Sequence, residues 1–217
     1  MSRFDLLRRK MVEQQLSDIV DPRVREAMES IPRHLFLEQI LQDRSYEDGP
    51  LPIGLGQTIS QPWIVARVTE LLELKGSESV LEVGCGSGYQ AAILSRLASR
   101  VVTIERHSAL AERARKVISD LGLRNVSVLA ADGTYGRSDL GPWDAILVSA
   151  GAPEPPAPLL AQLAAGGRLV LPMGDMDSQI LTRVRRSDDG ERFLAEERFE
   201  PCRFVPLLGR FGWKESA

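Results

Sequence analysis

The chain has 217 residues and a mass of 24.0 kDa, enough for one domain with an ordinary buried core. Its 27 Lys and Arg against 30 Asp and Glu leave a net charge of −3, without the basic excess that nonspecific nucleic-acid binding needs. With 43% hydrophobic and 26% charged residues, the composition is typical of a soluble globular protein and excludes wholesale disorder or membrane residence.

The two cysteines, Cys85 and Cys202, form no zinc-type pair and exclude a disulfide framework. The N-terminal residues alternate charged and apolar types, so no secretory signal is expected, and the longest apolar runs are too short to span a bilayer. We therefore expect a cytoplasmic protein with no metal and no membrane or nucleic-acid partner. We also expect a monomer, although the sequence does not define the oligomeric state.

The first third of the chain has helical periodicity, with apolar residues three and four positions apart. Asp21 is a good N-cap, and Pro22 follows it at the first helical position. Residues 49–56 are rich in Gly and Pro, which predicts a loop rather than regular structure. The stretches expected to be helical are 6–16, 22–31, 33–41 and 64–74.

From Ser79 onward, short apolar runs alternate with helical stretches, which predicts a doubly wound, mostly parallel α/β sheet with right-handed crossovers. The expected strands are 80–83, 101–104, 126–129, 145–148 and 168–171, and the expected helices are 89–98, 109–121 and 158–165. Two antiparallel strands, 179–186 and 193–204, follow around a turn at 188–190, which makes about seven strands. Their order in the sheet does not follow from the sequence.

We expect a single domain with three parts. A helical N-terminal extension with an active-site loop covers residues 1–75, a cofactor-binding α/β core covers 76–175, and the C-terminal antiparallel strands cover 176–217.

A glycine-rich segment follows the first core strand and opens a helix, where open α/β sheets bind ligands. A dinucleotide fingerprint beginning at Gly84 would need a glycine where Tyr89 stands, which disfavours a nicotinamide oxidoreductase. Glycines at 84, 86 and 88, preceded by Glu82, instead resemble the first motif of S-adenosylmethionine-dependent methyltransferases.

Acidic residues end the next two strands. Glu105 is placed to accept hydrogen bonds from both ribose hydroxyls, and Asp132 is placed to receive an adenine amino group, with the Gly133 amide nearby. Either carboxylate alone could be a solvated charge at a strand end. Together with the glycine loop they favour a nucleoside pocket.

A segment ahead of the core carries a more specific resemblance. Residues 51–62, LPIGLGQTISQP, look like the signature of the protein-L-isoaspartate O-methyltransferase family. The match continues through 80–92, 103–106, 143–153, 166–172 and 203–207 and so spans nearly the whole chain. The resemblance implies methyl transfer from S-adenosylmethionine to the α-carboxylate of L-isoaspartyl residues in damaged proteins and peptides. The methyl ester then collapses to a succinimide without enzymatic help.

The resemblance also implies the residues of the site. Cys85 stands where the family usually has Thr, and Ala131 stands where Gly is commoner, but both residues are small. The implied cofactor-binding residues are Thr58, Ile59, Ser60, Glu82, Gly84, Cys85, Gly86, Ser87, Gly88, Glu105, Arg106, Asp132 and Gly133. The substrate peptide is expected in a slot with Ile53 and Gly54 on one side and Phe204 and Val205 on the other, read through its main chain.

Ser60 is the expected catalytic residue, because a hydroxyl on a constrained loop can orient the substrate carboxylate towards the methyl group. A carboxylate is already ionised at neutral pH, so no general base is required. The competing interpretation is that Ser60 caps the helix that follows it. His34 is expected to be a helix-surface or packing residue rather than an acid or base. His107 comes shortly after Glu105, but a role for it at the edge of the adenosine site is disfavoured.

Other functions fit the sequence less well. A serine hydrolase is excluded by the absence of a GxSxG elbow. A related methyltransferase could act on the aspartate of a biosynthetic peptide or on a small carboxylate, although such relatives often carry a C-terminal extension. A non-catalytic S-adenosylmethionine-binding module is disfavoured by the intact segment 58–60.

Overall fold

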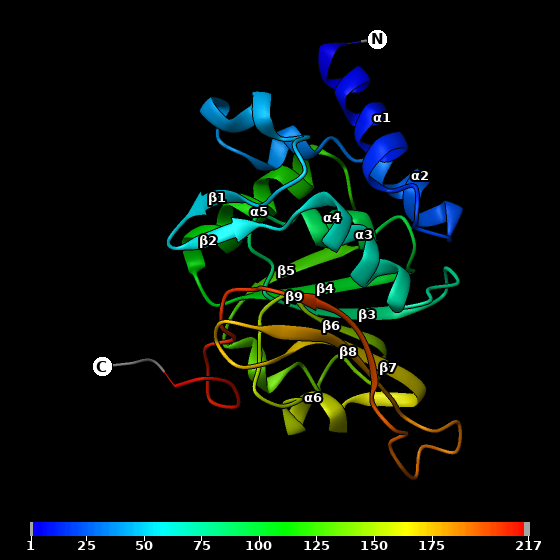
Figure 1. The fold of residues 1–217 in the computed structure, drawn as a ribbon. Coiled ribbons are helices and arrows are strands. Elements are labelled where there is room, and N and C mark those ends of the chain that lie inside the picture. Colours follow the sequence, from blue (N-terminus) through cyan, green and yellow to red (C-terminus); the bar gives the residue numbers. More distant parts are fainter. Residues whose placement is uncertain (1, 215–217) are drawn as a thin grey trace.

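A seven-stranded sheet runs through the middle of the molecule in the order β5-β4-β3-β6-β7-β8-β9 (Figure 1). The computed structural model describes residues 2–214. Neighbouring strands from β5 to β7 pair in parallel, and β8 and β9 are added by antiparallel pairing. The strands are β3 (Ser79–Val83), β4 (Arg100–Glu105), β5 (Val126–Ala130), β6 (Trp143–Val148), β7 (Leu163–Gly174), β8 (Gln179–Arg185) and β9 (Glu197–Cys202).

This topology confirms the predicted doubly wound sheet and supplies the order of the last two strands, which follow β7 as successive antiparallel neighbours. The chain runs outward from β3 to β5 and then returns to β6 on the other side of β3. The carboxyl ends of β3 and β6 therefore form a topological switch point, where such sheets bind ligands.

Helices cover both faces of the sheet, with α1 to α5 on one face and α6 on the other (Figure 1). Alternate strand residues face the two layers, so that Val80 packs with the first group of helices and Leu81 with the second. The helices are α1 (Arg3–Gln15), α2 (Pro22–Ser30), α3 (Pro62–Leu71), α4 (Tyr89–Leu94), α5 (Ser108–Asp120) and α6 (Ala157–Ala161), with short 3-10 helices η1 (Arg33–Phe36), η2 (Gln39–Arg44) and η3 (Gly133–Tyr135).

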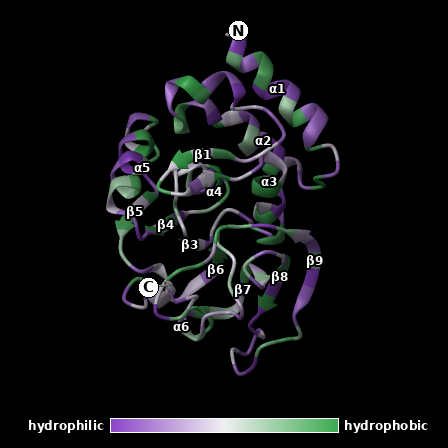
Figure 2. Cartoon of the chain, turned by 60° about the vertical axis from the view of Figure 1, so that its left-hand side comes forward, coloured by the Kyte–Doolittle hydropathy of each residue, from purple (hydrophilic) through white to green (hydrophobic). Residues whose placement is uncertain are grey.

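Local sequence signals explain where several elements begin. The predicted cap of α2 is confirmed, because the Asp21 side chain accepts a hydrogen bond from the Arg23 amide and Pro22 is the first helical residue. Helix α1 starts with a reciprocal capping box between Ser2 and Asp5. At the sheet edge, β9 is largely hydrophilic (Figure 2), as expected of a strand with an unpaired side.

The loop prediction for residues 49–56 is wrong. β1 (Leu51–Gly54) and β2 (Gln57–Ile59) form a separate two-stranded antiparallel sheet, which we call the hairpin. Pro52 is tolerated because it occupies an exposed position of an edge strand, while Leu51 and Ile53 point into the core. The tight turn between the strands uses positive φ at Gly54, Leu55 and Gly56.

Several boundaries also differ from the predictions. The helix expected over 33–41 is two 3-10 helices, η1 and η2. Helix α4 ends at Leu94 instead of Ala98, and β9 begins at Glu197 instead of Phe193. The helix expected to reach residue 165 ends at Ala161, because Leu163 already pairs with Trp143 in the sheet. Within residues 2–214, no helix combines the length and the apolar character needed to cross a membrane.

Candidate active site

The glycine loop, residues 84–88, is fixed to the end of the neighbouring strand. The amides of Gly84 and Cys85 both donate to the Ile104 carbonyl oxygen, at 2.9 and 3.1 Å. At its other end, Gly88 has φ +88°, and a Cβ there would lie 3.1 Å from the Ala114 Cβ of α5. The loop therefore approaches the helix so closely that a side chain at position 88 would have to displace its neighbours.

Glu105, at the end of β4, is held by both of its oxygens. Oε2 accepts a hydrogen bond from the Gly86 amide at 2.8 Å, and Oε1 accepts one from the His107 amide at 2.9 Å. The residue is 4% exposed. Each oxygen keeps a further lone pair for a ligand hydroxyl, so the loop presents an oriented carboxylate at the place predicted for a ribose.

Two small cavities adjoin at the carboxyl edge of the sheet and share Thr58, Gly84, Gly86 and Ser149 as walls. The first, of about 60 Å³, is also lined by Glu105, Arg106, Gly133 and Val205. The second, of about 40 Å³, is also lined by Ile59, Ser60, Cys85, Ser87 and Phe204. Most of the predicted cofactor residues are therefore brought together under the hairpin.

Ser60 lies between β2 and α3 and lines the second cavity together with Cys85 and Tyr89. The capping interpretation of Ser60 is wrong, because the N-cap of α3 is Gln61 and its side chain makes no capping bond. This placement leaves the Ser60 hydroxyl at the cavity wall, beside the glycine loop.

Asp132 is turned towards the C-terminal segment. Its Oδ1 accepts hydrogen bonds from the Thr134 amide and hydroxyl, and its Oδ2 accepts one from the Arg210 amide at 2.9 Å. Asp132 lines neither cavity, whereas its neighbour Gly133 lines the first. A Cβ on Gly133 would come within 2.6 Å of a Val83 methyl carbon, so glycine allows this close approach.

Glu82 lies beneath the glycine loop and is fully buried. Its Oε2 accepts a hydrogen bond from the Thr103 hydroxyl at 2.5 Å, and the Ser149 hydroxyl lies 3.5 Å from Oε1. Burial raises the pKa of Glu82 to about 8, so the side chain is predominantly protonated at neutral pH. Glu82 lines neither cavity, so its place is below the predicted cofactor site.

The two sides of the predicted peptide slot do not share a cavity. Phe204 and Val205 line the two cavities under the hairpin. Ile53 is buried and lines a third cavity next to α5, which shares Gly86 with both of these cavities and Ser87 with the second. Gly54 is exposed at the hairpin turn, lines none of the three cavities, and lies near Arg113.

Two polar residues in or next to the site were not predicted from the sequence. Ser149 follows β6 at the switch point, and its position directly after a core strand was the available signal. Gln179 lies at the start of β8, where its Oε1 accepts a hydrogen bond from the Phe204 amide at 2.8 Å. Its role depends on a contact between residues 25 positions apart, which no local pattern reveals.

The two histidines lie outside the cavities. His34 stacks on Phe4, with ring centroids 4.1 Å apart, and its Nδ1 is 2.8 Å from the Tyr46 hydroxyl. His107 is the N-cap of α5. Among residues 2–214, no cluster of three or more His, Cys, Asp or Glu side chains has the arrangement of a metal site.

These features define a class of protein. A glycine loop and an oriented carboxylate, Glu105, lie at the switch point of the sheet, where nucleotide-binding folds hold a ribose, and the fold is that of the Rossmann-like methyltransferases.

The comparisons with known proteins identify the family. A model of the family "Protein-L-isoaspartate(D-aspartate) O-methyltransferase (PCMT)" matches residues 7–212. A protein-L-isoaspartate O-methyltransferase of Trichlorobacter lovleyi is 53% identical over 216 residues, 99% of each chain. One of Methanoregula boonei is 52% identical over 209 residues, 95% of each chain. The chain therefore belongs to the protein-L-isoaspartate O-methyltransferase family and is an S-adenosylmethionine-dependent enzyme.

Solved structures agree with this assignment. A protein-L-isoaspartate O-methyltransferase structure superposes with a TM-score of 0.85 at 29% identity, covering 94% of this chain and 67% of that one. A putative enzyme of the same name from Plasmodium falciparum, in complex with S-adenosyl-L-homocysteine, has a TM-score of 0.78 at 24% identity, covering 94% and 98%. The second likeness supports the fold.

Proposed function

We propose that this chain methylates the α-carboxylate of L-isoaspartyl residues in damaged proteins and peptides, with Ser60 orienting that carboxylate. One observation carries the assignment of Ser60: the hairpin brings it to a cavity shared with Cys85 and Ser87 of the glycine loop. The adjoining cavity contains Glu105. A methyl donor bound along the loop would place its reactive end beside the Ser60 hydroxyl.

S-adenosylmethionine, when bound, supplies an electrophilic methyl group on a sulfonium centre. We assign Glu105 to the ribose hydroxyls, and the backbone of residues 84–88 together with Thr58, Ile59, Arg106 and Gly133 to the rest of the cofactor. Asp132 lines neither cavity, so it joins this set only if its carboxylate turns from the Arg210 amide towards the adenine amino group. Glu82 contributes by supporting the loop from below.

The substrate carboxylate titrates near 4 and needs no base, so the protein has to supply alignment and a partly dry site. Attraction between a sulfonium and a carboxylate ~4 Å apart is about 1 kcal/mol in water and roughly 4 kcal/mol at an effective dielectric of 20. That attraction is lost as charge is neutralised in the transition state. Positioning by the Ser60 hydroxyl is therefore the main contribution of the side chains.

The substrate is proposed to bind along Phe204 and Val205, with the exposed hairpin turn at Gly54 forming the opposite rim. Main-chain pairing with such a surface would accept many flanking sequences, which suits an enzyme that reads a damaged linkage. We further infer a cytoplasmic enzyme, supported by two free cysteines, Cys85 and Cys202. The monomeric state stays a prediction of the sequence.

The decisive experiment compares transfer of a labelled methyl group to an isoaspartyl peptide and to its normal aspartyl twin. The proposal expects a base-labile ester on the isoaspartyl peptide alone. Equal labelling of both peptides, or of neither, would refute the assigned substrate.

Ser60→Ala tests the proposed catalytic residue. We expect kcat to fall roughly tenfold to a hundredfold, because a misaligned carboxylate reaches the methyl group less often. The affinity for S-adenosylhomocysteine, measured by calorimetry, should stay within about twofold, because other residues hold the cofactor. Ser95→Ala, at the end of α4 and outside the cavities, is the control. An unchanged kcat in Ser60→Ala would remove Ser60 from the mechanism.

A further inference from the structure

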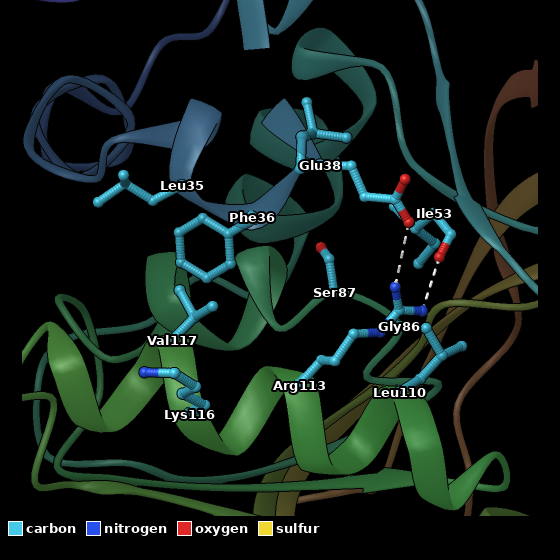
Figure 3. Close-up of a pocket in the computed structure, with 11 residues that line it drawn as sticks. Leu35, Phe36, Glu38, Ile53, Gly86, Ser87, Leu110, Arg113, Lys116 and Val117 are labelled. Carbon is cyan, nitrogen blue, oxygen red and sulfur yellow. Dashed lines mark hydrogen bonds and ion pairs between the residues drawn. The ribbon is translucent and has the colours of Figure 1, made fainter. Parts of the chain in front are cut away.

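Arg113, on α5, connects that helix to the hairpin. Its Nη2 donates a hydrogen bond to the Ile53 carbonyl oxygen at 2.8 Å, and its Nη1 lies 3.5 Å from the Glu38 carboxylate (Figure 3). Arg113 takes no part in the mechanism proposed above.

The side chain spans the edge of a mostly apolar cavity of about 200 Å³ that separates α5 from η1 and the hairpin (Figure 3). The apolar walls include Leu35, Phe36, Ile53, Leu110 and Val117. Ser87 and Lys116 also line the cavity and carry hydrogen-bond donors, but Lys116 pairs with Asp120, and it is Arg113 that donates to the Ile53 carbonyl oxygen. Ile53 is buried, but on the side that faces α5 it borders this cavity, so the hydrogen bond from Arg113 links the hairpin to that helix across the edge of the cavity.

The position of the hairpin determines the position of Ser60. The hairpin is a two-stranded sheet of its own, in which Leu51 pairs with Ile59, so a shift of one strand moves the other. Ile53 also abuts the glycine loop, since a Cβ on Gly86 would lie 3.3 Å from the Ile53 Cδ1. Movement of Ile53 into the cavity would thus move Ser60 and change its distance from the glycine loop.

We propose that Arg113 is a positioning residue. It holds the hairpin in the position in which Thr58 and Ser60 line the second cavity together with the glycine loop. It acts on the reaction through the Ile53 carbonyl and touches neither cofactor nor substrate. The effect on turnover rests on the proposed function, whereas the effect on the hairpin does not.

Arg113→Met tests this role, because it keeps an apolar stem and removes the donor. We expect kcat to fall roughly threefold to tenfold, since a displaced Ser60 aligns the carboxylate less often. The affinity for S-adenosylhomocysteine should change by less than about twofold. Arg113→Lys keeps a cationic donor and should show an intermediate kcat. Lys116→Met is the matched control, because Lys116 lies on the same helix, lines the same cavity and pairs with Asp120.

A merely structural role would lower the melting temperature and leave the kcat of the folded enzyme unchanged. The proposal is overturned if the kcat of Arg113→Met matches that of wild type, or if kcat falls as far in Lys116→Met as in Arg113→Met. If Arg113→Met lost as much affinity for S-adenosylhomocysteine as it lost in kcat, the proposal would also be overturned, because Arg113 would then take part in cofactor binding.

Hydrogen exchange supplies a readout that does not depend on turnover. Amides of residues 51–59 should exchange faster in Arg113→Met than in wild type or Lys116→Met, because the tether to α5 is gone. Unchanged exchange there would contradict the tether. If wild type fails to methylate the isoaspartyl peptide, the proposed function falls, while the exchange measurement still decides the role of Arg113.

Discussion

Glu82 shows how a single residue can link the site to pH. Its carboxyl group is fully buried below the glycine loop, with hydroxyl groups of Thr103 and Ser149 as its polar neighbours and no cationic hydrogen-bond partner among residues 2–214. Burial without a counter-charge favours the neutral acid, which is why the pKa rises to about 8. The folded state therefore keeps a proton on Glu82 up to about pH 8, whereas the unfolded chain releases it near a pKa of about 4.3.

We predict that Glu82 contributes a decrease in the free energy of unfolding as pH rises from about 5 to 8, because only the folded chain holds this proton in that range. The slope has an upper limit of about 1.4 kcal/mol per pH unit. Glu82→Gln removes the titrating group and should be more stable than wild type at about pH 8, with the difference shrinking towards about pH 5.

Urea unfolding at the two pH values measures this difference, and Glu112→Gln, on the exposed face of α5, is the control. A Glu82→Gln variant that keeps the pH slope of wild type would show that another group causes it.

The residues of the candidate site divide into two groups by the kind of signal that predicts them. Glu105 ends β4 and Gly133 lies three residues after the end of β5, so their positions at strand ends predict that they lie at the cavities. Gln179 and Arg113 act through contacts far along the chain, so local patterns give no warning of them. Asp132 also follows a core strand, but its carboxylate is turned towards the C-terminal segment, where it accepts a hydrogen bond from the Arg210 amide.

At the scale of elements, the strongly periodic segments were predictable and the glycine-rich ones were not. The core strands are short apolar runs and α5 has apolar residues at helical spacing, and the structure has these elements near the predicted bounds. The hairpin was missed because Gly and Pro are weak strand formers, and only the burial of Leu51, Ile53 and Ile59 on one side reveals its strands. The tertiary contact therefore overrides the local preference.

The contact between the glycine loop and α5 leads to a prediction for Gly88→Ala. A Cβ at position 88 would lie 3.1 Å from Ala114 and 3.2 Å from Ile118, and the residue has φ +88°. We expect a loss of about 2 to 4 kcal/mol in the free energy of unfolding, from backbone strain and overpacking together. The affinity for S-adenosylhomocysteine should fall as the loop is displaced.

Gly122→Ala separates backbone strain from overpacking. Gly122 also has a positive φ, +67°, but it has open space around its Cβ position. It should lose only about 1 kcal/mol and keep the wild-type affinity. Equal losses in both variants, measured by urea unfolding, would show that the contact with α5 is unimportant.

At the scale of the whole molecule, two arginines join the N-terminal extension to the last strands. Arg168 of β7 donates hydrogen bonds to the carbonyl oxygens of Leu72 and Glu73, which follow α3. Arg183 of β8 donates to the Leu71 carbonyl oxygen at 2.9 Å and to Glu73 Oε1 at 2.7 Å. The end of the helix that follows Ser60 is thus attached to the strands that lead to Phe204.

Glu197 of β9 completes this connection, because its two oxygens accept hydrogen bonds from Arg183, both at 2.7 Å, and Oε2 also accepts one from Arg185 at 3.1 Å. The hydrogen bonds from Arg183, together with those from Arg185, lower the pKa of Glu197 to about 2. The stabilisation is fully present above the unfolded pKa of about 4.3 and is lost as pH falls through about 2.

We therefore predict that Glu197→Gln lowers the free energy of unfolding by about 1 kcal/mol at neutral pH, a value reduced for the partial exposure of the carboxylate. The difference from wild type should narrow as pH falls below about 4 and disappear only below about pH 2, where the Glu197 carboxyl group is also neutral in the folded protein. Glu196→Gln is the control, because Glu196 has only a 3.8 Å contact with the exposed Arg198. Urea unfolding across this pH range measures both variants. A deficit in Glu197→Gln that persisted undiminished near pH 2 would show that the loss comes from packing of β9 and not from its charge.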